Sequence, residues 1–338
     1  EFLAKQIDGL QPGQIIDDEA LERETLLLGD LPGLETRAVI KPGAEYGTSD
    51  IVFLNEEDRY SGVIALNNFG RKSIGEYRLE GGFLMANPLF QGDMLNLSGI
   101  VAQDNRMLFG RIDYDSPVNT HGTRIGLSYS AFAYDVDVEE IGLPADSTLE
   151  GSGSSFVLRG SHPIVRSSRT NTTIFVSGRN SKTKEEGSAS IRPDSSINLL
   201  EVFASWDYLY RSYAKTTLYG GIVTNFKTRE DLLDTESQKA KLSLDVRHYQ
   251  PFSQNWFFIG RAVGVYSPDP LVDVERFRIG GQGSVRAFPS AELAGDKGGT
   301  ISLDVGVNIM TGGLVLTPKL FADAGRVYRI EPIGVPED

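Results

Sequence analysis

Residues 300–309 read TISLDVGVNI and alternate apolar and polar side chains without interruption. Successive side chains of a β-strand point to opposite faces, so one face of this stretch carries Ile, Leu and Val, while the other carries Thr, Ser, Asp, Gly and Asn. The stretch therefore predicts a strand with one apolar and one polar face. The same alternation recurs in residues 74–87, 198–210 and 241–249.

Alternating segments run from about residue 60 onward and predict about 13 strands, many longer than the ~5–6 residues usual in soluble sheets. Charged side chains lie on the polar face of these segments, among them Arg78, Glu80, Asp245, Arg247 and Asp304. Lipid outside and a watery lumen inside explain this arrangement, so we expect a mainly β fold, a transmembrane antiparallel β-barrel. Alternation alone leaves a large soluble β-protein open as the alternative.

The composition excludes several classes of function. The formal net charge is −13, which argues against a nucleic-acid partner because the phosphate backbone would be repelled. Cysteine is absent, so disulfides, thiolate metal sites and thiol catalysis are excluded. No stretch reaches the ~18 uninterrupted apolar residues of a membrane helix, which leaves a barrel possible.

The first 58 residues follow another pattern. Residues 17–33 predict a helix that Asp17 or Asp18 caps and that Gly29 and Pro32 end. Two strands are expected after it, at residues 34–43 and 48–58. A helix with two strands is a small α+β module, and its start looks cut off.

A glycine-rich stretch, GGQGSVRAFPSAELAGDKGG at residues 280–299, interrupts the alternation. With the preceding VERFRI it resembles the signature loop of the two-partner-secretion transporters, the TpsB branch of the Omp85 superfamily, which includes ShlB-, FhaC- and HecB-like proteins. The matching loop positions are Gly280, Gly281, Val285, Arg286, Phe288, Gly295 and Asp296. A second family element, Phe-x-Asp-x-Gly, is present as Phe321, Asp323 and Gly325.

The resemblance implies a domain organisation. Residues 1–58 would be the end of a POTRA domain, and residues 59–338 an incomplete barrel of a family that closes at about sixteen strands. Loop 268–298 would fold into the lumen, where Arg286 would pair with Asp323 and hold the loop as a plug or gate. Alternation also directs Asp323 toward the polar face. Ala287 replaces the usual family glycine, so we expect backbone strain if that position has a positive φ.

The resemblance also implies a function. The protein would be an outer-membrane pore of a Gram-negative bacterium that secretes an unfolded exoprotein, such as a haemolysin, adhesin or filamentous haemagglutinin-like protein. It would work as a monomeric barrel in lipid and lipopolysaccharide, without a cofactor, a metal or catalysis. An outer-membrane protein assembly factor is the alternative. A passive porin would need neither the N-terminal module nor the loop, and the three histidines, His121, His162 and His248, lie outside any nucleophile motif that would favour an enzyme.

Overall fold

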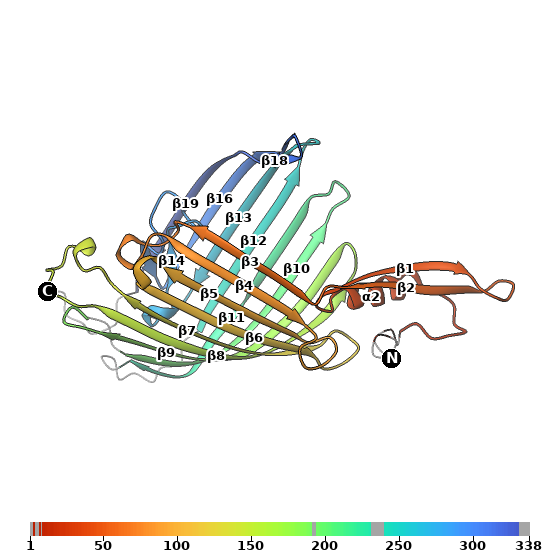
Figure 1. The fold of residues 1–338 in the computed structure, drawn as a ribbon, viewed down its shortest axis with the longest axis horizontal. Coiled ribbons are helices and arrows are strands. Elements are labelled where there is room, and N and C mark those ends of the chain that lie inside the picture. The colour runs from red at the N-terminus through yellow and green to blue at the C-terminus, as the bar shows by residue number, and fades with distance from the viewer. Residues whose placement is uncertain (1–2, 4–6, 8, 191–193, 231–239, 331–338) are drawn as a thin grey trace.

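A computed structural model describes residues 3, 7, 9–190, 194–230 and 240–330. The outermost parts of both predicted domains, including residues 331–338, therefore lie outside the described residues. The described chain forms a small N-terminal helix and hairpin, followed by one curved antiparallel sheet of 13 strands (Figure 1). The predicted mainly β fold and the expected number of strands are confirmed.

The elements follow the sequence pattern closely. The N-terminal module consists of α2 (Asp18–Gly29), β1 (Leu34–Pro42) and β2 (Ser49–Glu57). The sheet contains β3 (Tyr60–Asn67), β4 (Arg78–Ala86), β5 (Met94–Ala102), β6 (Met107–Pro117), β7 (Arg124–Asp135), β8 (Glu150–Arg166), β9 (Thr170–Glu186), β10 (Ser195–Leu209), β11 (Lys215–Glu230), β12 (Ala240–Pro251), β13 (Trp256–Tyr266), β16 (Lys297–Val307) and β19 (Lys319–Tyr328). Two small hairpins add β14 (Phe277–Ile279) with β15 (Leu293–Gly295), and β17 (Ile309–Thr311) with β18 (Leu314–Leu316).

Strands that follow one another in the chain lie side by side in the sheet. The strands from β3 to β13 are arranged in sequence order and are followed by β16 and β19, so β3 and β19 are the two edge strands of the described sheet. The strand expected over residues 300–309 ends at Val307, and Ile309 already belongs to the β17–β18 hairpin. A loop of residues 267–296 joins β13 to β16 and carries the β14–β15 hairpin.

The two faces of the sheet differ as the alternation predicts. Ile301, Leu303 and Val305 of β16 are exposed on the convex face, where a lipid bilayer would cover them. Thr300 is buried and the Asp304 side chain is only 15% exposed on the concave face, which we call the lumen. No helix among the described residues is long and apolar enough to cross a membrane.

The N-terminal module docks on the turn between β8 and β9. Asp17 caps α2 as expected, because its Oδ2 accepts a hydrogen bond from the Ala20 backbone N–H at 2.9 Å. At the other end of the helix, Asp30 receives two bonds from Arg166, each of 2.7 Å. Figure 1 shows the module outside the sheet, next to the strand ends at which β3 begins. Its assignment as the end of a POTRA domain remains a prediction.

The Arg166–Asp30 pair gives a testable contact. Replacing Arg166 by alanine removes both bonds, but Asp30 is 46% exposed, so we expect a loss of only about 1 kcal/mol. Limited proteolysis at residues 58–59, between the module and the sheet, should become about five-fold faster. Arg37→Ala is the control, because the partner of Arg37 is Glu35 on the same strand. Equal cleavage of both variants would show that the pair does not hold the module.

Candidate functional site

The loop of residues 267–296 turns back onto the lumen face of the sheet. Gly280 and Gly281 make this turn with φ values of +108° and +87°. A Cβ at Gly280 would lie 2.3 Å from the Pro289 carbonyl oxygen, and one at Gly281 would lie 2.6 Å from Ser290 Oγ. Both positions therefore need glycine for conformation and for space.

Arg286 is the most strongly bonded residue of the loop. Its Nε and Nη2 donate to the two carboxylate oxygens of Asp323 at 2.8 and 2.6 Å, and its backbone N–H donates to the same carboxylate at 3.0 Å. Asp323 is a β19 residue whose side chain is only 3% exposed. A parallel pair of charged bonds fixes orientation as well as charge. The structure thus brings together the two residues that the family resemblance pairs.

A second carboxylate, which the sequence did not single out as a partner, also holds Arg286. Asp304 on β16 accepts a bond from Arg286 Nη2 at 2.6 Å. The only sequence signal was its place on the polar face of the 300–309 stretch. The hydrogen bonds to Asp323 and Asp304 raise the pKa of the Arg286 guanidinium above its ordinary value, so it stays charged throughout the physiological range.

Phe321 and Gly325, with Asp323, form the surface of β19 on which the loop rests. We call this surface the seat of the loop. The Phe321 ring centroid lies 4.0 Å from Arg286 Cζ, which is a cation–π contact. A Cβ at Gly325 would lie 3.0 Å from Val285 Cγ2 and 3.3 Å from Ile279 Cδ1. Glycine at this position therefore allows the buried Val285 to close against the strand.

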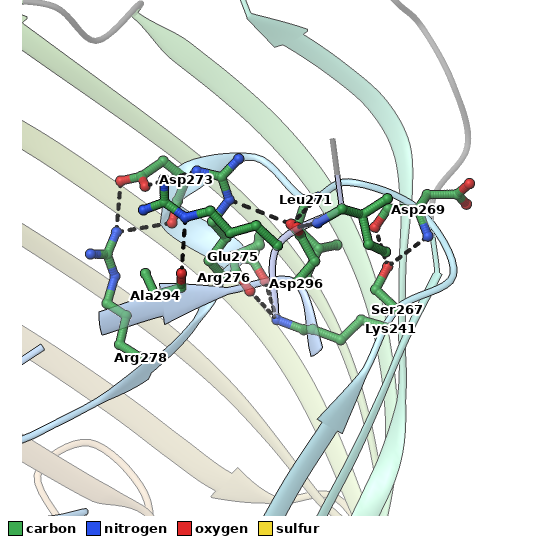
Figure 2. Close-up of polar contacts among 12 residues, drawn as sticks. Lys241, Ser267, Asp269, Leu271, Asp273, Glu275, Arg276, Arg278, Ala294 and Asp296 are labelled. Carbon is green, nitrogen blue, oxygen red and sulfur yellow. Dashed lines mark hydrogen bonds and ion pairs between the residues drawn. The ribbon is translucent and has the colours of Figure 1, made fainter. Parts of the chain in front are cut away.

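Gly295 and Asp296 close the base of the loop. Asp296 is fully buried, and its carboxylate accepts the backbone N–H groups of Leu271 and Ile330, each at 2.7 Å. Arg276 Nε lies 3.4 Å from the same carboxylate (Figure 2). A Cβ at Gly295 would approach the Tyr328 carbonyl oxygen to 2.7 Å. These residues join the start and the end of the loop to the end of β19.

Two further positions of the loop motif are Phe288 and Ala287. The Phe288 side chain is 57% exposed, and the structure joins this residue to the loop through its backbone, which accepts from Gly281 N–H at 2.8 Å. Ala287 does not have a positive φ, so the condition under which we expected backbone strain is not met. The left-handed non-glycine residue of the loop is Ala291, at φ 57°.

The loop also reaches the edge of the sheet opposite β19. Ser290 Oγ donates to the Phe69 carbonyl oxygen at 3.1 Å, and Glu292 pairs with Arg71 at 3.3 Å. Phe69 and Arg71 belong to the connection between β3 and β4. The loop therefore contacts both ends of the sheet, β19 through Arg286 and the β3–β4 connection through Glu292.

A cavity of about 470 Å³ adjoins Arg286 on the lumen face. Several charged side chains line it, among them Arg247, Arg261, Asp245 and Lys319. Arg261 donates to Asp245 at 2.6 Å and to the Gly283 carbonyl oxygen at 3.4 Å. Polar, water-accessible space next to the seat of the loop is what a lumen requires.

The comparisons with known proteins agree with this geometry. A family model described as haemolysin secretion/activation protein ShlB/FhaC/HecB matches residues 47–333. The chain belongs to the ShlB/FhaC/HecB family. The family expected from the loop motif is thereby confirmed.

Individual relatives of this ShlB/FhaC/HecB chain are distant. The heme/hemopexin transporter protein HuxB of Haemophilus influenzae (strain 86-028NP) is 24% identical over 324 residues, which are 92% of this chain and 56% of HuxB. The outer membrane transporter CdiB of Dickeya dadantii is 24% identical over 310 residues, which are 85% of this chain and 53% of that protein. The chain spans a little over half the length of the curated relatives it matches.

Solved structures show the same fold for this ShlB/FhaC/HecB chain. CdiB from Escherichia coli superposes with a TM-score of 0.79 at 19% identity, covering 91% of this chain and 59% of CdiB. BamA from Haemophilus ducreyi lacking POTRA domains 1–3 superposes with a TM-score of 0.59 at 15% identity, covering 97% of this chain and 69% of BamA. At these identities the likeness establishes the architecture.

Proposed function

We propose that the protein containing this chain is an outer-membrane pore of a Gram-negative bacterium that secretes an unfolded partner exoprotein. The seated loop carries this proposal, because Arg286 holds the loop on the lumen face through Asp323 and Asp304. The relatives support it, since they are named as heme/hemopexin, hemolysin and outer membrane transporters.

The proposed route uses no nucleotide, cofactor or catalytic step. The client arrives unfolded in the periplasm, and the module of residues 1–58, as the end of a POTRA domain, captures it by adding it to a strand edge. The client then crosses the lumen once the loop leaves its seat. Folding at the cell surface draws the chain outward. The pore works as a monomer, and its partners are the client, lipid and lipopolysaccharide.

A barrel-assembly function is the second candidate, because BamA shares the fold. The two functions differ in their clients: a secretion pore acts on one exoprotein, whereas an assembly factor acts on many barrels.

Replacing the loop residues 282–291 by a short Gly-Ser linker in the full-length protein tests the pore. We expect a larger single-channel conductance, because the linker lacks Arg286 and cannot seat on Asp323. Appearance of the partner exoprotein at the cell surface should depend on the intact protein, while the amounts of other outer-membrane barrels stay unchanged. Loss of those barrels in a deletion strain, with normal exoprotein secretion, would favour the assembly factor instead.

A further inference from the structure

The loop has two parts that differ in how they are held. We call residues 267–279 the loop root and residues 280–292 the loop tip. The tip is the part that contains Arg286. The root has its own contacts with the lumen face, among them the contact of Glu275 with Lys241 (Figure 2).

Glu275 is the centre of the root contacts. It lies in a short 3-10 turn, Asp273–Glu275, and its side chain is only 7% exposed. Its carboxylate accepts from Lys241 Nζ of β12 at 2.7 Å and from Arg179 Nη2 of β9 at 2.9 Å. Lys241 also donates to the Glu275 carbonyl oxygen at 3.1 Å. One loop residue is thus tied to two strands of the sheet.

The partners of Glu275 are themselves largely withdrawn from water. Arg179 donates in addition to Glu201 of β10 at 2.9 Å. The side chains of Lys241 and Arg179 are 15% and 25% exposed. Removing one member of such a buried group leaves an uncompensated charge, which costs far more than losing an exposed pair.

Apolar packing supports the ion pairs. Val272 of the root is buried against three residues of the lumen face: Ile197 and Leu199 of β10, and Val223 of β11. The space left among these side chains and Glu275 is about 30 Å³. Apolar residues on a polar lumen face would be unfavourable in water, so the root covers them.

The tip is held differently. Its buried apolar residue is Val285, Arg286 bonds to Asp323 and Asp304 and lies over the Phe321 ring, and the Arg71–Glu292 pair is more than 40% exposed on both sides. Gly280 and Gly281 separate the tip from the root, and both have positive φ. Glycines at this junction permit a change in backbone direction at little steric cost.

We propose that the root stays docked while the tip alone moves, and that Glu275, with Arg179 and Lys241, is the positioning residue that keeps it docked. This inference rests on the proposed pore function. It limits the moving part of the gate to residues 280–292. The root is then a fixed part of the lumen, and the hinge on the root side of the tip lies at Gly280–Gly281.

Cross-linking separates the two parts. The described chain contains no cysteine, so paired cysteines can be introduced into the full-length protein, with any cysteine outside this chain replaced. V223C with V272C joins the root to β11, and S284C with S302C joins the tip to β16, where Ser302 Oγ lies 3.3 Å from the Ser284 carbonyl oxygen. A short thiol-reactive cross-linker should leave secretion unchanged in the first variant and abolish it in the second.

The outcomes distinguish this inference from the proposed function. Secretion that stops on cross-linking the root would overturn the fixed root. Secretion that continues with the tip cross-linked would also overturn the inference, because the tip would then not be the part that moves. The uncross-linked variants serve as controls, because each must secrete before the reagent is added.

Thiol labelling tests Glu275 without relying on transport. In a V272C background, Glu275→Gln should raise the labelling rate of the cysteine by about tenfold or more, because Arg179 and Lys241 lose the carboxylate. Glu275→Asp should restore part of the protection. Glu292→Gln is the matched control, since it is the same change at a glutamate of the tip, whose partner is Arg71. Equal labelling in the Gln variant and the parent would refute the role of Glu275.

Discussion

Replacing Arg286 by alanine is expected to release the loop tip from its seat on β19, while the sheet still assembles. The change removes the side-chain bonds to Asp323 and Asp304, and both carboxylates then stay on the lumen face without their cation. Loss of one partner of a desolvated pair costs several kcal/mol, so the seated state should become at least about 30-fold less populated. Without a defined closed position, the tip no longer controls passage of the client through the lumen.

Secretion and assembly are measured separately for this variant. The amount of exoprotein at the cell surface should fall by about tenfold or more, because the tip no longer returns to one defined position between opening events. Heat-modifiable migration of the barrel on gels should stay unchanged. Arg286→Lys, which keeps the charge but not the parallel bonds, should be intermediate. Arg71→Ala removes an exposed loop pair and should have little effect. Full secretion by the alanine variant would contradict the role of Arg286.

Replacing Asp296 by alanine should have the second large effect. The carboxylate is fully buried and accepts the backbone N–H groups of Leu271 and Ile330. Each buried donor left without an acceptor costs about 1–3 kcal/mol, so the base of the loop should open. We expect protease cleavage within residues 268–298 to become at least about tenfold faster, together with a loss of secretion.

Asp269→Ala is the matched control for the base of the loop. Asp269 lies in the same segment, but its carboxylate has no bonded partner in the described part of the chain and points away from the base (Figure 2). Cleavage of this variant should match the parent protein. If the Asp296 variant is cleaved no faster than the Asp269 variant, the buried carboxylate does not hold the loop.

Much of the fold could be predicted because alternation is a local property. The side-chain period of a strand sends Ile301 and Leu303 outward and Asp304 inward without reference to any neighbour. The cap at Asp17 follows equally from local chemistry. The pairing of Arg286 with Asp323 came from the family motif, and the structure places them in contact.

The remaining contacts depend on register across strands, which a single sequence does not reveal. Asp304 reaches Arg286 because β16 lies next to β19, where Asp304 is opposite Phe321. Glu275 meets Lys241 and Arg179 only after the sheet has curved and the loop has turned back. A sequence motif also does not specify backbone dihedral angles, so it could not show that Ala287 lacks a positive φ.

The reach of the loop tip across the lumen has a consequence for the order of folding. The partners of the tip lie beside the first strands of the sheet, at Phe69 and Arg71, and on the last described strand, at Asp323. Contacts separated by 221 residues form late, because the intervening chain must first be organised. Seating of the tip is therefore a late step of maturation, and it can take place only on a sheet in which both β19 and the β3–β4 connection are in position.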